Sequence, residues 1–173
     1  DMLIMVVDVG AGTSDLSLFR IHFNPATGKN MALEVRNASR GIRAAGNHLD
    51  RMLIELIIKK SGVTSRDPMW LNIRSALELQ IRDLKETLFN DDSVFVPLLN
   101  KSEVTIKLSE FLALEPVHQV GERLRGTMTE ILESIDESWV NWVMAHPNRR
   151  LVVALTGGGA ELPMVKALAE RSI

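Results

Sequence analysis

The chain has 173 residues, of which 46% are hydrophobic, and its 20 basic residues nearly balance its 22 acidic ones. A chain of this size can bury a core without disulfides or metals. Its net charge of −2 argues against non-specific electrostatic binding to nucleic acid or to acidic lipid. The absence of cysteine excludes disulfide frameworks, thiolate zinc sites and cysteine nucleophiles. Because the chain opens at Asp1 and not at methionine, we expect it to be a piece of a longer protein.

The first part of the chain predicts an antiparallel sheet of three strands. Met2–Val9 is a continuous apolar run that only Asp8 interrupts, which is typical of a buried strand. A glycine-containing turn follows it, and a second turn separates the predicted strands 15–23 and 31–37. Strands joined by short turns in this way favour a meander.

Helical periodicity begins after this meander. Apolar residues recur at helical spacing from Leu49 to Ile57, and Gly62 ends this predicted helix. Asp67 as cap and Pro68 at the first helical position predict the start of a second helix. The remaining predicted elements are strands at 93–98, 103–108 and 151–155, the last of them buried, and helices at 109–114, from 116 and from 163.

The turn after the first strand has the composition of a phosphate site. Gly10 and Gly12 let the backbone take positive φ and bring bare N–H groups close to an anion, and Thr13 adds a hydroxyl donor. Asp8 lies at the end of an apolar strand, where an unpaired carboxylate is costly, and a hydrated Mg²⁺ bridging to phosphate is a suitable partner. A tight hairpin whose glycines only satisfy geometry has the same pattern.

A second strand and glycine turn lie near the end of the chain. The strand 151–155 is followed by Thr156-Gly-Gly-Gly159, and a helix begins near Pro163. Helix N-termini present unpaired N–H groups, so this segment fits a nucleotide contact, although a plain strand-to-helix connection looks alike. It lacks the Gly-Lys-Ser/Thr of a Walker motif and the spacing of a dinucleotide fingerprint.

Together, the two turns resemble a known pair of motifs. DVGAGTSDLSL (8–18) resembles the second phosphate motif of the actin-like ATPase superfamily, and LTGGGAELPMV (155–165) resembles its adenosine motif. Three further segments are similar to the DnaK-type seventy-kilodalton heat-shock chaperones: AGNHLDRMLIELI (45–57), LKETLF (84–89) and VTIKLSEFLALEPV (104–117). The resemblance runs from about Met2 to about Leu168 and covers only the second lobe of that family's nucleotide-binding domain.

This resemblance implies a fold and a domain organisation. The fold would be α/β, an actin-like ATPase (ribonuclease-H-like) lobe with a mixed sheet and helices, plus an inserted small α+β subdomain. The main actin-like subdomain of lobe II is expected at 1–45 and 116–173, and the inserted subdomain at 46–115.

The resemblance also implies site residues for ATP or ADP and Mg²⁺. Asp8 would hold the metal through water, and Asp15 would support the metal's water shell. Lys85 matches a ribose-contacting lysine. The residues implied to contact the nucleotide are Gly10, Ala11, Gly12, Thr13, Gly46, Lys85, Gly157 and Gly158. No catalytic residue is assigned to this lobe.

The chain departs from the family at the adenine clamp. Where the family has a glutamate, an arginine and a serine around the base, this chain has Arg82, Glu86 and Phe89. The family arginine that stacks on adenine from the far side matches Glu161. Losing both arginines removes the planar cations that stack on the base. The phosphate and metal positions therefore match the family more closely than the adenine positions do. Ala11 replaces the middle glycine of the family's phosphate motif, which is a mild change if φ there is negative.

The expected function is the ATP-binding part of a DnaK-like molecular chaperone, inactive alone because the first phosphate loop and the catalytic carboxylate belong to a first lobe. Its expected partners are that first lobe, co-chaperones and client proteins. We expect it to bind neither nucleic acid nor a membrane, and we expect it in the cytoplasm. Two alternatives stay open. One is a degenerate, non-catalytic actin-like interaction module, and the other is a filament-forming actin-like protein, against which the DnaK-like insertion argues.

Overall fold

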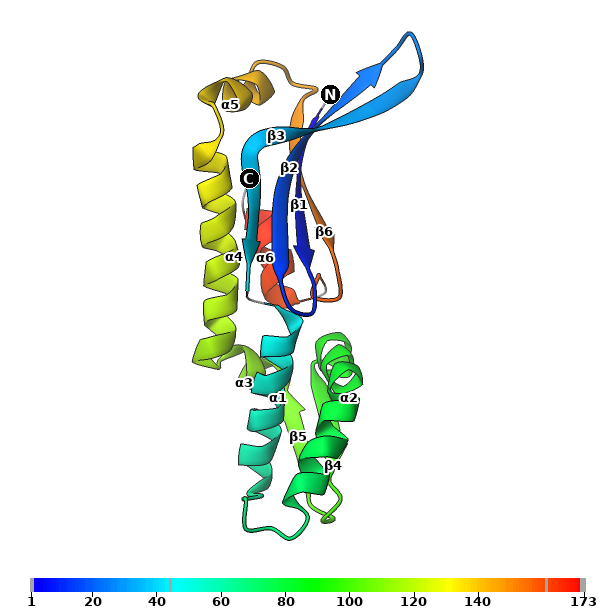
Figure 1. Ribbon diagram of the computed structural model, residues 1–173, viewed down its shortest axis with the longest axis vertical. Coiled ribbons are helices and arrows are strands. Elements are labelled where there is room, and N and C mark those ends of the chain that lie inside the picture. The colour runs from blue at the N-terminus through cyan, green and yellow to red at the C-terminus, as the bar shows by residue number, and fades with distance from the viewer. Residues whose placement is uncertain (1, 44, 161, 172–173) are drawn as a thin grey trace. The chain divides into compact units, whose positions relative to one another are not determined.

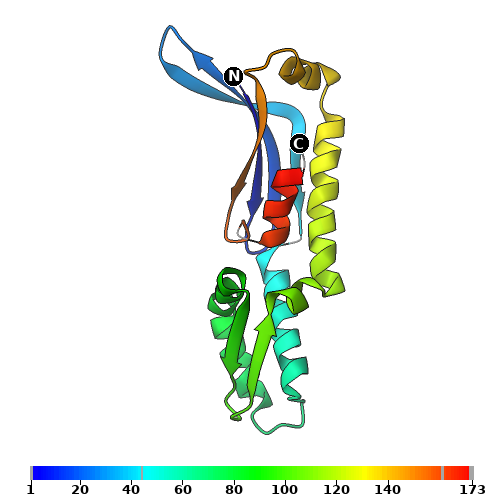
Figure 2. The same ribbon diagram turned by 180° about the vertical axis from the view of Figure 1, so that it is seen from behind.

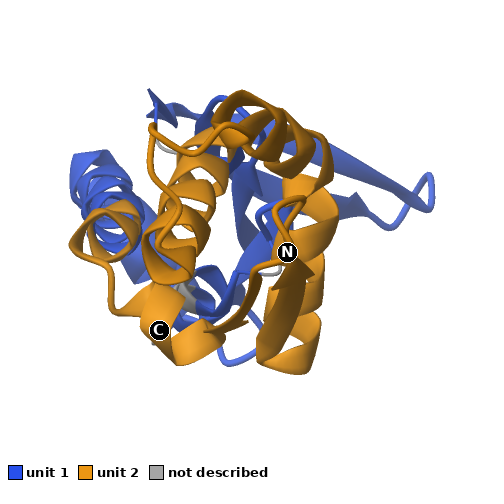
Figure 3. Cartoon of the chain, turned by 90° about the horizontal axis from the view of Figure 1, so that it is seen from below, with its two compact units in different colours: residues 1–46, 121–173 blue, residues 47–120 orange. Residues whose placement is uncertain are grey.

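A computed structural model describes residues 2–43, 45–160 and 162–171. The chain has a mixed α/β architecture and divides into two compact units, 1–46 with 121–173 and 47–120 (Figure 3). The second unit thus ends at residue 120, inside a helix, whereas the expected inserted subdomain ends at residue 115, five residues earlier. Glu161, at one of the clamp positions, lies outside the described residues.

The first unit is built on a four-stranded sheet in the order β3-β2-β1-β6 (Figure 1). The strands are β1 (Met2–Val9), β2 (Ser14–Asn24), β3 (Lys29–Ile42) and β6 (Arg150–Thr156). β1, β2 and β3 pair antiparallel, which confirms the predicted meander, and β6 adds to β1 in parallel.

β3 runs farther than the predicted strand 31–37. Asn37 has a φ of 60° within it, and the register of β2 with β3 shifts between Ser17 and Phe19. Asparagine tolerates this left-handed conformation better than most residues. A local irregularity of this kind bends a strand without ending its pairing. A sequence pattern of period two breaks at such a position, which is why the predicted strand ends at residue 37.

Helices cover one face of this sheet. They are α4 (Glu115–Ser134), of which residues from Gly121 belong to this unit, and α6 (Pro163–Arg171). A further helix, α5 (Glu137–Met144), follows α4 and has no buried residue. Figure 2 shows α6 lying over the sheet, with its axis running roughly along the strands. The alternate β1 residues on the covered face are fully buried, namely Leu3, Met5, Val7 and Val9.

The opposite face of the sheet stays partly exposed, which corrects two expectations. β1 was predicted to be buried throughout, but Met2 is 38% exposed and Ile4 and Val6 are half-buried. The strand 151–155 was also predicted to be buried, yet none of the residues of β6 is. β6 is an edge strand with a neighbour on one side only, and an apolar run alone does not reveal which face is covered.

The second unit packs helices with a two-stranded sheet. Its elements are α1 (Gly46–Ser61, the first residue assigned to unit 1), α2 (Trp70–Asp91), β4 (Ser93–Pro97), β5 (Glu103–Lys107) and α3 (Leu108–Leu112). The start predicted for α2 is wrong. The Asp67 carboxylate accepts hydrogen bonds from the Met69 N–H at 2.8 Å and from Asn100 at 3.0 Å, and so fixes a turn before the helix.

Asp136 caps α5 in the first unit, because its Oδ1 accepts a hydrogen bond of 2.8 Å from the Ser138 N–H. This bond holds the pKa of Asp136 below its ordinary value of 3.8. The cap therefore stabilises the fold fully above that ordinary value, and its contribution is lost as the pH falls through the lower folded pKa.

We expect the carboxyl carbon of Asp136 to titrate below 3.8 in an NMR pH series. Asp136→Ala should speed amide hydrogen exchange in α5, since the cap is removed. A titration midpoint at or above the ordinary value would contradict the capping role.

Candidate functional site

The two glycine turns follow neighbouring parallel strands and meet at one end of the sheet. β1 leads into Gly10, β6 leads into Gly157, and Asp8 pairs in register with Thr156. The Gly159 N–H donates to the Val9 carbonyl at 2.9 Å, and the Gly46 N–H donates to the Gly10 carbonyl at 3.0 Å. The structure therefore brings together the three glycine segments that the sequence pointed to within the first unit.

The second turn packs directly on the end of β1. Gly157 has a φ of 84°, and a Cβ there would lie 2.6 Å from the Val9 carbonyl oxygen and still closer to the Asp8 carboxylate. A Cβ at Gly159 would lie 2.8 Å from the Val9 Cβ, whereas one at Gly158 would meet nothing within 4 Å. Gly159, which was not among the predicted site residues, is thus as constrained by packing as Gly157 is.

The first turn leaves its backbone open to solvent. Ala11, Gly12 and Thr13 are exposed, and the Gly10 N–H closes the turn on the Thr13 carbonyl at 2.9 Å. The turn does not use the positive φ that its glycines allow, because neither Gly10 nor Gly12 has one. Ala11 likewise has no positive φ, so its side chain fits here without strain.

Two carboxylates face each other beside this turn. Asp8 and Asp15 are direct cross-strand partners in β1 and β2, and both are exposed. Asp15 Oδ2 accepts a hydrogen bond of 3.3 Å from the Thr13 hydroxyl, while Asp8 has no hydrogen bond or ion pair to a described residue. Like charges directly opposite on paired strands are destabilising, so a cation between them would relieve repulsion. This repulsion, and not the burial expected from the sequence, favours a partner for Asp8.

The donor set suits hydrated Mg²⁺ better than a direct protein cage. In the described ranges, no three His, Cys, Asp or Glu side chains converge on one point. Mg²⁺ usually keeps several waters and uses one or two carboxylates together with substrate phosphates. Asp8 and Asp15 fit that requirement through water.

Lys85 is engaged elsewhere, in the second unit. Its ammonium pairs with the Asp50 carboxylate, and both side chains are only 12% exposed. The predicted ribose contact would require this ion pair to open, and it stays a prediction. Phe89, at a clamp position, packs on Phe111 with ring centroids 6.1 Å apart.

No protein-family model and no curated protein matches this chain. None of the described helices has the length and apolar character that crossing a membrane requires.

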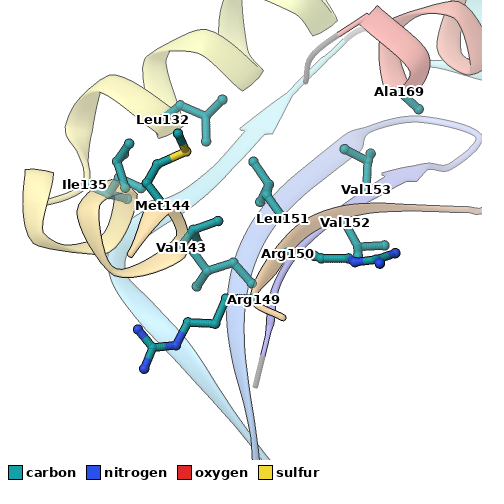
Figure 4. Close-up of a pocket in the computed structure, with 12 residues that line it drawn as sticks. Leu132, Ile135, Val143, Met144, Arg149, Arg150, Leu151, Val152, Val153 and Ala169 are labelled. Carbon is teal, nitrogen blue, oxygen red and sulfur yellow. The ribbon is translucent and has the colours of Figure 1, made fainter. Parts of the chain in front are cut away.

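A separate apolar cavity of about 740 Å³ lies at the other end of β1 and β6, between α4, α5 and β6. Figure 4 shows Leu151 directed toward the side chains of α4 and α5, and the Arg149 guanidinium directed away from them. Arg149 lies over the Trp142 ring, 4.4 Å from its centroid, and donates to the Trp142 carbonyl at 2.8 Å. This cavity and the glycine turns are therefore distinct features of the first unit.

Proposed function

We propose that this chain is a Mg²⁺-nucleotide-binding lobe of an actin-like ATPase of the DnaK type. One observation carries the proposal: two glycine turns follow the neighbouring parallel strands β1 and β6 at one end of the sheet, and the second of them packs against the Asp8 carboxylate. In open α/β sheets, ligands bind beyond the carboxyl ends of parallel strands, which is where these turns lie.

Each part of the site would have a separate task. The exposed amides of residues 11–13 would donate to phosphate oxygens, and Asp8 and Asp15 would accept hydrogen bonds from the water shell of Mg²⁺. Bound Mg²⁺ supplies charge neutralisation on the phosphates. Gly157 would keep the Asp8 carboxylate and the second turn in contact, because a side chain there cannot fit.

The complete activity would belong to a two-lobed protein. The resemblance places the first phosphate loop and its catalytic carboxylate in a first lobe, so this lobe would bind nucleotide weakly and hydrolyse none alone. Co-chaperones and client proteins would be the partners of the whole, in the cytoplasm.

A non-catalytic interaction module is the second candidate, because two observations favour it. The Lys85 ammonium is held by Asp50, and Phe89 packs on Phe111, so these two positions serve the second unit itself. The apolar cavity beside β6 offers a surface that the nucleotide proposal leaves unused.

Paramagnetic NMR tests the proposal and tolerates weak binding. We expect Mn²⁺·ADP to broaden the amide signals of Gly10, Gly12 and Gly158 in the ¹⁵N-labelled chain. Asp8→Asn should weaken Mg²⁺·ADP binding about tenfold or more, which corresponds to about 1.4 kcal/mol, because one of two metal-facing carboxylates is lost.

Asp83→Asn, an equal charge change on the exposed face of α2, is the matched control and should leave the affinity for Mg²⁺·ADP unchanged. Equal affinity in the wild type and in Asp8→Asn would remove the metal role. No nucleotide response in a folded wild type would favour the interaction module.

A further inference from the structure

A third polar residue extends the row formed by the two carboxylates. Asp8 is paired with Asp15 on β2 at one side and with Thr156 on β6 at the other. Residues in register on neighbouring strands share a face of the sheet and lie about 4.8 Å apart from strand to strand. Asp15, Asp8 and Thr156 therefore stand side by side, and all three are exposed.

The three side chains differ in what they can do. Ionised carboxylates only accept hydrogen bonds, whereas a threonine hydroxyl can also donate one. The waters of a hydrated cation need acceptors, which Asp8 and Asp15 supply, and phosphate oxygens need donors. The Thr156 hydroxyl has no hydrogen bond to any described residue, so it is available to donate.

The position of Thr156 is closely held. It pairs in register with Asp8, and the turn that follows it is tied to the end of β1 by the Gly159 N–H, which donates to the Val9 carbonyl at 2.9 Å. The β-branched side chain of threonine also has few χ1 rotamers. A hydroxyl held in this way pays little conformational entropy when it contacts a ligand.

We propose that Thr156 is a nucleotide-contacting residue, whose hydroxyl donates to a phosphate oxygen beside the cation held by Asp8 and Asp15. The inference rests on the proposed function and adds a residue that the resemblance did not assign. It competes with a simpler explanation, that Thr156 only ends an edge strand. Valine forms strands at least as well as threonine, so on that explanation Thr156→Val would have no effect on binding.

Thr156→Val removes the hydroxyl and keeps the shape of the side chain. We expect it to weaken Mg²⁺·ADP binding about ten- to a hundredfold, the usual effect of one lost hydrogen bond to a charged group. Thr156→Ser should restore affinity to within about twofold. Thr105→Val, a matched change at an exposed strand position in β5, should have no effect.

The titrations separate this inference from the proposed function. Loss of affinity in Asp8→Asn together with wild-type affinity in Thr156→Val would overturn only the role of Thr156. Wild-type affinity in both variants, or no nucleotide binding by the wild type, would overturn both proposals. Equal losses of affinity in Thr156→Val and Thr156→Ser would assign the effect to packing and overturn the hydroxyl contact. A urea unfolding midpoint that is altered in both variants would do the same.

Discussion

Replacing Gly157 with alanine is expected to lower the free energy of unfolding by about 2–4 kcal/mol. A methyl group there would come within 2.6 Å of the Val9 carbonyl oxygen and 2.8 Å of the Val9 carbonyl carbon. The Asp8 carboxylate, which is also in the way, can rotate aside, but the backbone of β1 cannot. A φ of 84° adds strain for any residue with a Cβ.

Gly158→Ala is the matched control, because it lies next in the same turn. Its Cβ would meet nothing within 4 Å and its φ is not positive, so the free energy of unfolding should stay within about 0.5 kcal/mol or rise slightly. Urea unfolding followed by circular dichroism measures both variants. Similar losses in the two would mean that the turn does not pack on β1 as described.

The same pair of variants separates two roles for the second glycine turn. If its glycines serve mainly to let a nucleotide approach the backbone, Gly158→Ala should weaken Mg²⁺·ADP binding, since a methyl group at Gly158 would occupy space that no atom of this chain fills. If they serve mainly to pack the turn on β1, Gly157→Ala should cost stability first and affect binding through displacement of Asp8. The contact distances favour the second role.

Local patterns predicted the elements of this chain well where one period governs a segment. The apolar run of β1 and the helical stripe of α2 are of this kind. The stripe predicted for the second helix consists of Ile73, Leu77, Ile81, Leu84 and Leu88, and all of these are buried except Leu84, which is half-buried. The start of α2 was wrong because the Asp67 carboxylate has two competing uses, as a helix cap or as the acceptor in a turn, and only tertiary contacts such as that with Asn100 decide between them.

The site was predictable in part. Asp8 and both glycine turns stand out in the sequence, since glycines after an apolar strand mark a close approach of backbone. Thr156 does not, because its place beside Asp8 depends on the register of two parallel strands whose paired residues are 148 positions apart in the chain. The pairing of Lys85 with Asp50 was hidden for the same reason, although both lie on predicted helices.

Lys85→Met is expected to lower the free energy of unfolding by about 2–3 kcal/mol. The Lys85 and Asp50 side chains are each only 12% exposed, so removing the ammonium leaves a nearly buried carboxylate without its counter-charge. Breaking one side of a fully buried ion pair costs about 3–5 kcal/mol, and the small remaining exposure reduces that figure. Methionine keeps most of the length of the lysine side chain, so the loss is mainly electrostatic.

A double-mutant cycle identifies the cause. Adding Asp50→Leu to Lys85→Met should recover most of the lost stability, because replacing both partners by apolar groups removes the unpaired charge. Lys60→Met is a control in the same unit: its ion pair with Glu110 has side chains 39% and 41% exposed, so its loss should change stability little. Additive losses in the Lys85 and Asp50 double variant would contradict the buried pair.

A different substitution of Asp50 tests whether Lys85 contacts the nucleotide. If Lys85 contacts the ribose, as the resemblance implies, its ion pair with Asp50 must open when the nucleotide binds. The free energy needed to open that ion pair weakens the observed affinity. Asp50→Asn, which releases the ammonium and leaves a neutral side chain, should then strengthen Mg²⁺·ADP binding. If Lys85 serves only the second unit, Asp50→Asn should leave the affinity unchanged, while Asp8→Asn still lowers it. The direction of this one change therefore decides whether Lys85 belongs to the site or to the fold.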